Sequence, residues 1–417
     1  MSGTRIESSG ASQHAAAPHA LGHPDDKRSD RIHNPALDAL RVVGALAVFV
    51  KHSSLATGQQ LQPGYGWMNH FEIGPTIFFV LSAYLVYGPF VRALLDGREA
   101  MSVGRFAMRR VLRIVPLYWL ALVVLYAVDH QRASGIGIKI GGVVGAIELA
   151  TFTHIYDPQR FFNGIAAAYT LDVEVSFYVF VVAWVAVLHR WARRSERPQR
   201  VLGWALVGLM VFNALWRAAV GHWLRPAATV CSSTQTHWTC AGVNWLPGFL
   251  DYFVIGMALA LAAACWQRDG PPRWLVAALS LRWLWLVIAG AMFWLYAAKF
   301  GTIGLDSLTG VKAELRHELN GFIVLILAIP AVFTTVDRGL VARVICSKAV
   351  RLGATFSYGF YLWHQGWIDL GLRATGARQF HGNFAIIATF AVFYAVLTAA
   401  VSWVLVERPI QHWQSRR

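Results

Sequence analysis

The segment 37–52, LDALRVVGALAVFVKH, is almost entirely apolar, yet it contains Asp38, Arg41 and His52. Ionisable side chains are costly inside a bilayer, and those found there are commonly functional. In an α-helix, the eleven residues from Arg41 to His52 and the fourteen from Asp38 to His52 bring the three side chains to nearly the same face. The spacing therefore predicts a helix with one polar face, turned toward the protein interior.

The two ends of this face suit different chemistry. Arg41 can bind an anion, and Asp38, three residues earlier, can pair with it. His52 lies about 16 Å further along the helix axis, and the near-neutral pKa of a free imidazole suits a general base. The alternative interpretation is that charged residues only mark the membrane boundaries, which fits Asp38 and Lys51 better than Arg41.

Further polar residues interrupt the later apolar segments. They are Ser82 in 72–92, Arg109, Arg110 and Arg113 in 105–122, Asp172 and Glu174 in 167–180, His364 in 355–368, and Glu407 with Arg408 and Pro409 in 401–413. Arg110 and Arg113 share a helix face and can hold phosphates, although such a cluster also serves as a topology determinant. Two carboxylates beside an apolar run are difficult to explain by packing alone.

The composition indicates which elements carry these residues. Of the 417 residues, 56% are hydrophobic and 14% charged, whereas about a quarter of the residues in a soluble domain are charged. Apolar runs near the ~20 residues that cross a bilayer occur at 36–52, 73–91, 111–128, 173–189, 201–220, 245–266, 283–300, 319–336, 354–372 and 384–406. We therefore predict an all-α, polytopic transmembrane helix bundle of about ten spans.

The basic residues predict the orientation of this bundle. The net charge of +15 reflects Lys and Arg in cytoplasmic loops and not a nucleic-acid partner. If the weakly apolar segment 136–153 does not cross, 25 Lys and Arg residues fall on one side of the membrane and eight on the other. If it crossed, the arginine-rich loop 190–200 would lie outside, against the positive-inside rule. We expect 136–153 to be re-entrant or interfacial.

This topology places both termini in the cytoplasm. Residues 1–33 lack an apolar run and are expected to form a disordered cytoplasmic tail, followed by a transmembrane domain at 34–413 and a short cytoplasmic tail at 414–417. Cys231 and Cys240 fall in an outer loop and are a disulfide candidate, with two unpaired thiols as the alternative. We expect no metal, because no clustered Cys or His spacing accompanies them.

Taken in order, these motifs resemble the membrane acyltransferase-3 family, integral-membrane enzymes that O-acylate sugars, cell-wall polymers and natural products. The first helix matches the family pattern over 37–52, including its Arg-x10-His spacing. The other matches are FFVLSAY at 78–84, RRVLRIVPLYWL at 109–120, a looser YTLDVEVSFY at 169–178, SYGFYLWH at 357–364 and ERP at 407–409. In the loosest motif the usual Trp-Ser pair is replaced by Tyr169 and Thr170, which keeps a hydroxyl, and Glu174 keeps one of two carboxylates.

The resemblance implies an enzyme that takes acyl-coenzyme A, most commonly acetyl-CoA, from the cytoplasm as a co-substrate, without a permanently bound cofactor. It implies a catalytic set of His52, Glu174 and Asp38, coenzyme-phosphate ligands at Arg41, Arg110 and Arg113, and substrate contacts at Ser82, Thr170, Asp172, His364 and Glu407. We expect His52 to act as a general base, with an acyl-His52 intermediate as the rival route. Glu174 is expected to orient His52 or the acceptor.

We therefore predict a multi-pass O-acyltransferase of a bacterial-type cell membrane that acylates a hydroxyl of a glycan or of a glycosylated small molecule. Because the sequence ends shortly after 407–409, we expect no catalytic domain fused behind the spans. A proton-coupled carrier of a sugar or small metabolite is the alternative, since intramembrane Asp, Arg, Glu and His also suit transporters. The internal repeat that many transporters carry is not found between 34–220 and 221–413.

Overall fold

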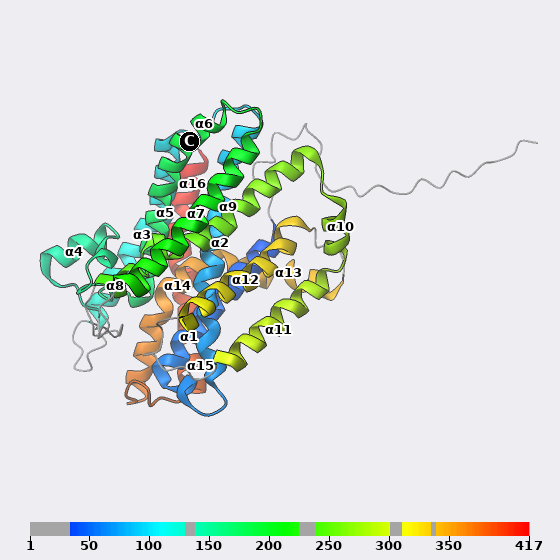
Figure 1. Cartoon of the computed structure of the whole chain (residues 1–417). Coiled ribbons are helices and arrows are strands. Elements are labelled where there is room, and N and C mark those ends of the chain that lie inside the picture. Colours follow the sequence, from blue (N-terminus) through cyan, green and yellow to red (C-terminus); the bar gives the residue numbers. More distant parts are fainter. Residues whose placement is uncertain (1–33, 130–137, 225–237, 301–310, 335–338, 417) are drawn as a thin grey trace, which may run out of the picture. The chain divides into compact units, whose positions relative to one another are not determined.

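A computed structural model describes residues 34–129, 138–224, 238–300, 311–334 and 339–416, and the regular elements in these ranges are all helical. The α-helices are α1 (Pro35–Thr57), α2 (Ile73–Leu95), α3 (Val103–Asp129), α4 (Gly142–Ala150), α5 (Tyr169–Trp184), α6 (Arg190–Ala192), α7 (Pro198–Ala218), α8 (Trp238–Gly242), α9 (Leu246–Asp269), α10 (Arg273–Ser280), α11 (Arg282–Phe300), α12 (Val311–Phe333), α13 (Leu340–Ile345), α14 (Lys348–Ala374), α15 (Phe384–Ser402) and α16 (Arg408–Ser415) (Figure 1). The predicted all-α bundle is confirmed.

Nine helical stretches of the described chain are long and apolar enough to cross a membrane, and they correspond to nine of the ten predicted spans. The tenth, 354–372, lies inside the 27-residue helix α14, whose Tyr, Trp, His and Gln residues lower its hydropathy. α14 packs against α1, α3 and α15, and Ser357 and His364 on it are buried. The least apolar of the ten predicted spans is therefore one that packs against other helices of the protein.

The outward faces of other helices expose large apolar side chains. Examples are Val187, Trp204, Trp294, Phe393 and Leu405, each of which is more than half exposed. Such surfaces are unfavourable in water and suit contact with lipid, where a helix satisfies its own backbone hydrogen bonds. The chain is a multi-pass membrane protein.

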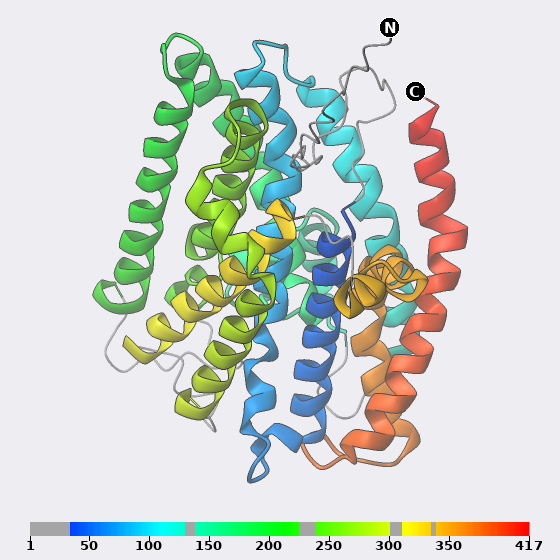
Figure 2. The ribbon, with the colours of Figure 1, turned by 90° about the vertical axis from the view of Figure 1, so that its right-hand side faces the viewer.

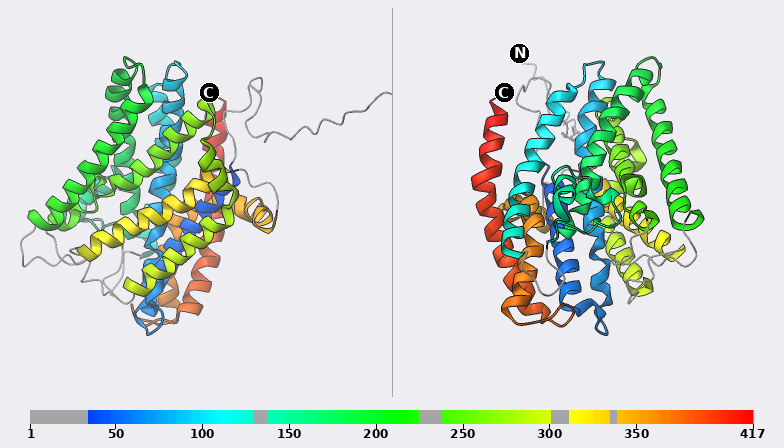
Figure 3. Two further views of the ribbon diagram at one scale, coloured as in Figure 1. Left: turned by 45° about the vertical axis from the view of Figure 1, so that its right-hand side comes forward. Right: turned by 90° about the vertical axis from the view of Figure 1, so that its left-hand side faces the viewer.

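One end of the bundle collects basic loops, and we call it the basic end. Arg193 donates through Nη2 to the carbonyl of Arg98 (3.4 Å), and Arg268 donates through Nη1 to the carbonyl of Leu95 (3.1 Å). α6 and the C-terminal end of α16 lie at the same end (Figure 1, Figure 3). The ten-span topology assigns these loops to one side of the membrane, and the structure brings them together.

The opposite end joins α1 to the loop between α14 and α15. The backbone N–H of Phe380 donates to the carbonyl of Ala56 (2.8 Å), and that of Gly382 donates to the carbonyl of Thr57 (3.2 Å). Figure 2 shows α1 running toward this end beside α2. The last turn of α1 is thus covered by residues more than 300 positions later in the chain.

Segment 136–153 contains no spanning helix within its described part. α4 has nine residues, fewer than the ~20 that cross the hydrocarbon core, which agrees with the expectation that this segment does not span. Residues 136 and 137 lie outside the described ranges, as do the expected tail 1–33, Arg417 and Cys231. Cys240, on α8, is disulfide-bonded.

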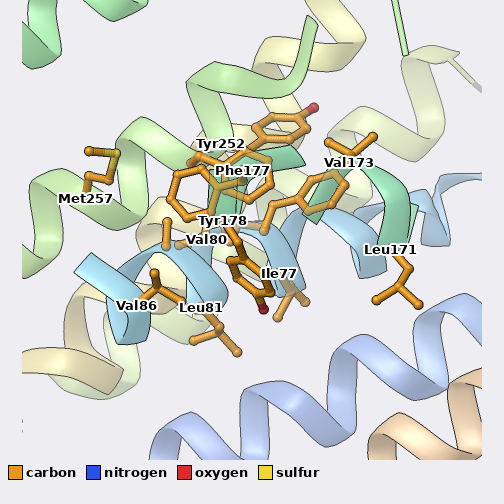
Figure 4. Close-up of a cluster of buried hydrophobic side chains, with 14 of the residues drawn as sticks. Ile77, Val80, Leu81, Val86, Leu171, Val173, Phe177, Tyr178, Tyr252 and Met257 are labelled. Carbon is orange, nitrogen blue, oxygen red and sulfur yellow. The ribbon is translucent and has the colours of Figure 1, made fainter. Parts of the chain in front are cut away.

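Part of the largest buried core lies between α2, α5 and α9. Phe177 of α5 stacks on Phe253 of α9 with ring centroids 4.2 Å apart, and Figure 4 shows Phe177 beside Val80 of α2 and Tyr252 of α9. Gly256 permits the close approach of α9 to α2, because a Cβ there would lie 2.2 Å from the carbonyl oxygen of Val80. Small residues are the usual means of such approach between membrane helices.

α1 begins and ends at residues whose types favour it. The Asn34 side chain accepts a hydrogen bond from the N–H of Ala36 (2.9 Å) and Pro35 is the first helical residue. Gly58 ends the helix at a φ of 77°, which glycine adopts without strain. α1 packs between α2 and α14, so its polar face is directed at the elements that carry the other predicted site residues.

Candidate functional site

A cavity of about 100 Å³ lies between α1, α2, α3, α5 and α14. Arg41, Arg110 and Arg113 line it, with Arg113 exposed and the other two half-buried. Glu174 is the acidic residue among those that line it, so the cavity has a net positive charge. Its other lining residues are Phe78, Phe79, Leu81, Ser82, Leu85, Ile114, Thr170, Leu171, Tyr178, Ser357, Tyr358 and Tyr361. The arrangement suits an anionic group such as a phosphate.

Two of the arginines are held by neighbours that leave donors available. Arg41 donates through Nη1 to Oδ1 of Asp38 (2.9 Å), as predicted from their spacing. The guanidinium of Arg110 lies over the rings of Phe106 and Tyr178, 5.7 and 5.4 Å from their centroids. Since a guanidinium has five N–H groups in a planar fork, one ion pair or stacked ring orients it without exhausting its hydrogen bonds.

Glu174 is held by two hydroxyl groups. Ser82 donates from Oγ to Oε1 of Glu174 (2.6 Å), and the Tyr178 hydroxyl donates to the same oxygen. Its expected role of orienting His52 or the acceptor stays a prediction, and the Glu174 carboxylate lies within the arginine cavity. There it offsets part of the positive charge and keeps Ser82 in a fixed orientation.

His52 is instead paired with His364. Nδ1 of His52 lies 2.7 Å from Nε2 of His364, and the two ring planes differ by 5°. Nδ1 of His364 lies 2.7 Å from the carbonyl oxygen of Tyr361. This places two histidines, 312 residues apart in the chain, in one hydrogen-bonded chain that ends at a backbone carbonyl.

The carbonyl determines where the protons lie in this chain. A carbonyl oxygen only accepts, so His364 carries its proton on Nδ1 and, when neutral, accepts through Nε2. His52 must then donate from Nδ1, which leaves the lone pair of its neutral ring on Nε2. The nitrogen of His52 that remains for chemistry is Nε2.

Tyr361 connects the two halves of the site. Its side chain lines the arginine cavity and its carbonyl orients His364. Its hydroxyl lies 2.6 Å from Oγ1 of Thr170 and also donates to the carbonyl of Ala167. Predicted residues from α1, α2, α3, α5 and α14 thus converge on one connected region.

Besides His364, two predicted substrate contacts lie outside the cavity lining. Asp172 is fully buried and pairs with Nδ1 of His154 at 2.7 Å, which ties the segment before α5 to that helix. Glu407 lies in the π-helical turn 403–407, close enough to Arg113 to interact with it electrostatically. Asp172 therefore has a structural partner, whereas Glu407 borders the arginine cluster at the basic end.

Sequence analysis missed a second buried polar cluster, centred on Arg316 at the start of α12. Arg316 makes a two-pronged ion pair with Glu72, which also accepts from the Tyr296 hydroxyl (2.9 Å) and from Nδ2 of Asn320 (3.1 Å). Arg316 is one of the eight Lys and Arg residues that the ten-span topology places on the outer side of the membrane, and this obscured its role. Arg316 and Asn320 are four residues apart at the edge of an apolar run, so they share one face of a helix. This spacing was the signal in the sequence that could have revealed the cluster.

The same cluster continues to α7 and α9. Nε2 of His317 lies 2.8 Å from Oδ2 of Asp251, and Arg217 donates through Nε to Oε2 of Glu314 at 2.6 Å. Glu314, Arg316 and His317 therefore each pair with a different helix. We call the ion pairs of Arg316, His317 and Glu314 the α12 network. No group of three or more His, Cys, Asp or Glu suited to a metal occurs among the residues that the structure describes.

Comparisons with known proteins identify the family of the chain. A family model described as an acyltransferase domain matches residues 34–407. The chain is similar to the peptidoglycan O-acetyltransferase OatA of Listeria monocytogenes serovar 1/2a, with 21% identity over 405 residues that cover 92% of this chain and 57% of that protein. The chain thus spans little more than half the length of this relative, and no solved structure matches it. The chain belongs to the acyltransferase-3 family and is a multi-pass membrane acyltransferase.

Proposed function

We propose that the protein transfers an acyl group, most simply acetyl, from acyl-CoA to a hydroxyl of a glycan or of a glycosylated small molecule. The observation that carries this proposal is the connection, through Tyr361, between a cavity lined by Arg41, Arg110 and Arg113 and the paired histidines His52 and His364. The arginine cavity suits phosphate groups, and the histidine pair suits proton transfer.

The arginine cavity is the proposed site for the coenzyme phosphates. Arginine binds phosphate oxygens through paired N–H groups, and the cluster lies on α3 and α1 toward the basic loops. An extended pantetheine arm is comparable in length to the rise of about 16 Å from Arg41 to His52. With its phosphates at the arginines, the coenzyme can present its thioester to His52.

The proposed chemistry uses His52 as a general base. Nε2 of His52 takes the proton of the acceptor hydroxyl while the oxygen attacks the thioester carbonyl, the C–S bond breaks, and the proton passes to the leaving thiolate. The imidazolium formed in between donates from Nδ1 to His364, which stays neutral and accepts. An acyl-His52 intermediate is the rival route and would be recognised by acyl label retained on the protein before acceptor is added.

The test uses purified protein in detergent with labelled acetyl-CoA. Wild-type protein should release CoA or transfer the label without any ion gradient, which a carrier does not do. His52→Ala should abolish this activity while the protein keeps its melting temperature. His222→Ala, at an exposed position in the π-helical turn 219–223 that follows α7, is the matched control and should retain activity. Full activity of His52→Ala would overturn the assignment.

The proposed orientation places the basic end in the cytoplasm of a bacterial-type cell, where acyl-CoA is available. It follows from the collection of Lys and Arg in the loops at that end. The name of the relative OatA describes a peptidoglycan O-acetyltransferase, so a cell-wall glycan is one acceptor class to examine first. Mass spectrometry of glycans and glycosylated metabolites, with and without the gene, would identify a lost acyl mass.

A further inference from the structure

A second cavity, of about 390 Å³, lies where α1 meets the start of α15. Its lining residues are Thr57, Gln59, Gln62, Tyr65, Gly382, Asn383, Phe384 and Ala385, and we call it the α1–α15 groove. It lies at the end of α1 opposite Arg41, and nothing in the arginine cavity or the histidine pair uses it. Its volume falls within the range of small-molecule sites.

The lining of the groove is polar without being charged. Gln59, Gln62 and Asn383 present amides, Thr57 a hydroxyl and Tyr65 a partly exposed phenol. Asn383 accepts through Oδ1 from the N–H of Ile386 (3.1 Å), which leaves its NH₂ as a donor. Amides and hydroxyls both donate and accept hydrogen bonds, so the groove matches a neutral ligand that is rich in hydroxyl groups.

The groove is built on the helix that carries His52. Thr57 follows His52 by five residues, a rise of about 7.5 Å. Between them lies Ser53, whose buried Oγ has no hydrogen-bond partner, and the Thr57 hydroxyl donates to the carbonyl of Ser53 (2.8 Å). Ser53 and Thr57, four residues apart, share one face of α1, so polar atoms extend along that face from the groove to the residue that adjoins His52.

The wall of the groove is held firmly. The loop 375–383 is bonded to the last turn of α1, and a Cβ on Gly58 would lie 2.1 Å from the carbonyl oxygen of Phe380. Phe380 itself has a φ of 66°, a left-handed conformation that costs free energy in a bulky residue and persists only where the surroundings enforce it. Such enforced strain is found preferentially at ligand sites.

We propose that the α1–α15 groove is the acceptor subsite and that it binds a neutral carbohydrate, one of whose hydroxyls is presented to His52. The coenzyme and the acceptor then approach His52 from opposite ends of α1. This inference rests on the proposed acyl transfer. It goes further in two respects: it assigns the place where the acceptor binds, and it states that the bound part of the acceptor carries no charge. The chemical step is the acyl transfer described above. The carbohydrate O–H gives its proton to His52, its oxygen forms the bond to the acyl carbon, and the C–S bond of the thioester breaks.

The experiment compares wild-type protein with the double variant Gln59→Leu/Gln62→Leu, which removes two amides and keeps side-chain size. Leu61→Ala is the matched control, because Leu61 is exposed between the two glutamines and does not line the groove. Acceptor-free CoA release and acetyl transfer are both measured with labelled acetyl-CoA. The probes are methyl glucoside, the methyl glycoside of N-acetylglucosamine and, as the charged counterpart, methyl glucuronide.

We expect the neutral glycosides to accept acetyl better than the glucuronide. The double variant should raise the KM for the neutral glycoside by about tenfold, as expected for the loss of one or two hydrogen bonds. Its KM for acetyl-CoA and its acceptor-free CoA release should stay at the wild-type level, and Leu61→Ala should behave as wild type.

The two proposals fail in different ways. Wild-type protein that releases no CoA under any condition would overturn the proposed acyl transfer. Wild-type activity combined with an unchanged glycoside KM in the double variant would overturn the acceptor subsite alone. A preference for the glucuronide, or an equal loss of acceptor-free CoA release in the double variant, would also overturn it.

Discussion

The arginine cavity and the α12 network are both polar clusters within the helix bundle, but their charges are balanced differently. In the α12 network each of Arg316, His317 and Glu314 has a partner of opposite type on another helix. In the cavity, three arginines face one lining carboxylate, with Asp38 paired to Arg41 behind them. Paired charges hold helices together, whereas excess charge of one sign provides a place for a ligand of the other sign.

The largest expected effect comes from breaking a pair in the α12 network. Arg316→Met leaves the half-buried carboxylate of Glu72 without its counter-charge, and removing one partner of a buried ion pair typically costs about 3–5 kcal/mol. We expect a sharp fall in the amount of folded protein in the membrane and in its melting temperature in detergent. Adding Glu72→Gln to the variant should restore part of both.

Arg160→Met is the control for this prediction. Arg160 also makes a two-pronged pair, with Glu148 (2.7 and 3.0 Å), but its side chain is more accessible than that of Arg316, and exposed pairs add little to stability. Equal losses of stability in Arg316→Met and Arg160→Met would remove the distinction between a structural network and a surface pair.

A change in the arginine cavity should affect the coenzyme and not the fold. Arg113→Gln should raise the KM for acetyl-CoA by about 10- to 100-fold, the value of a lost charge-assisted hydrogen bond, and leave the melting temperature unchanged. Arg109→Gln is the control, because Arg109 is an exposed neighbour that does not line the cavity. A melting temperature that fell with activity would instead assign Arg113 to structure.

His364 is a positioning residue, and its replacement should have a smaller effect than loss of His52. His364→Phe removes the acceptor for Nδ1–H of His52, and we expect kcat to fall by about tenfold or more, below the 10²–10⁴-fold typical of a general base. The KM for acetyl-CoA should not change. His364→Gln, whose side-chain carbonyl oxygen can accept the hydrogen bond, should recover part of kcat. A kcat of His364→Gln no higher than that of His364→Phe would contradict the proposed role.

The smallest expected effect is at Ser82. Ser82→Ala removes one of the two hydroxyls that bond to Glu174 and leaves that of Tyr178. We expect kcat/KM to fall by about three- to tenfold, in line with one neutral hydrogen-bond donor, with no loss of stability. Ser402→Ala, a buried serine bonded to the carbonyl of Ala399, provides the comparison, and an equal loss there would make the Ser82 effect non-specific.

Much of the bundle follows from local features of the sequence. Runs of apolar residues long enough to cross a bilayer locate most spans, because in lipid a helix must satisfy its own backbone. The short α4 agrees with the decision, made from basic loops alone, that 136–153 does not cross. The predicted span 354–372 lies inside α14, whose aromatic and polar residues keep it out of the nine helical stretches of the described chain that are apolar enough to cross a membrane, so this span stays a prediction.

The candidate site was only partly predictable. Arg41, Arg110 and Arg113 share one cavity as expected, because helix periodicity fixes which side of each helix they occupy. The partners of the site residues on other helices were not predictable, since the helical period does not indicate which helices lie side by side. Glu174 therefore accepts hydrogen bonds from Ser82 and Tyr178, whereas Asp172, two residues away on the same helix, lies at ion-pair distance from His154.

By itself, the sequence determined that this chain crosses a membrane many times, that its basic loops share one side, and that Arg41 and His52 lie on one face of a helix. These are consequences of hydrophobicity and of the 3.6-residue period, which act within a single segment. Only the tertiary structure decided that His52 pairs with His364, that Arg316 is a core residue, and that loop 375–383 completes a groove beside α1. Each of these depends on contacts between helices far apart in the chain, which packing alone selects.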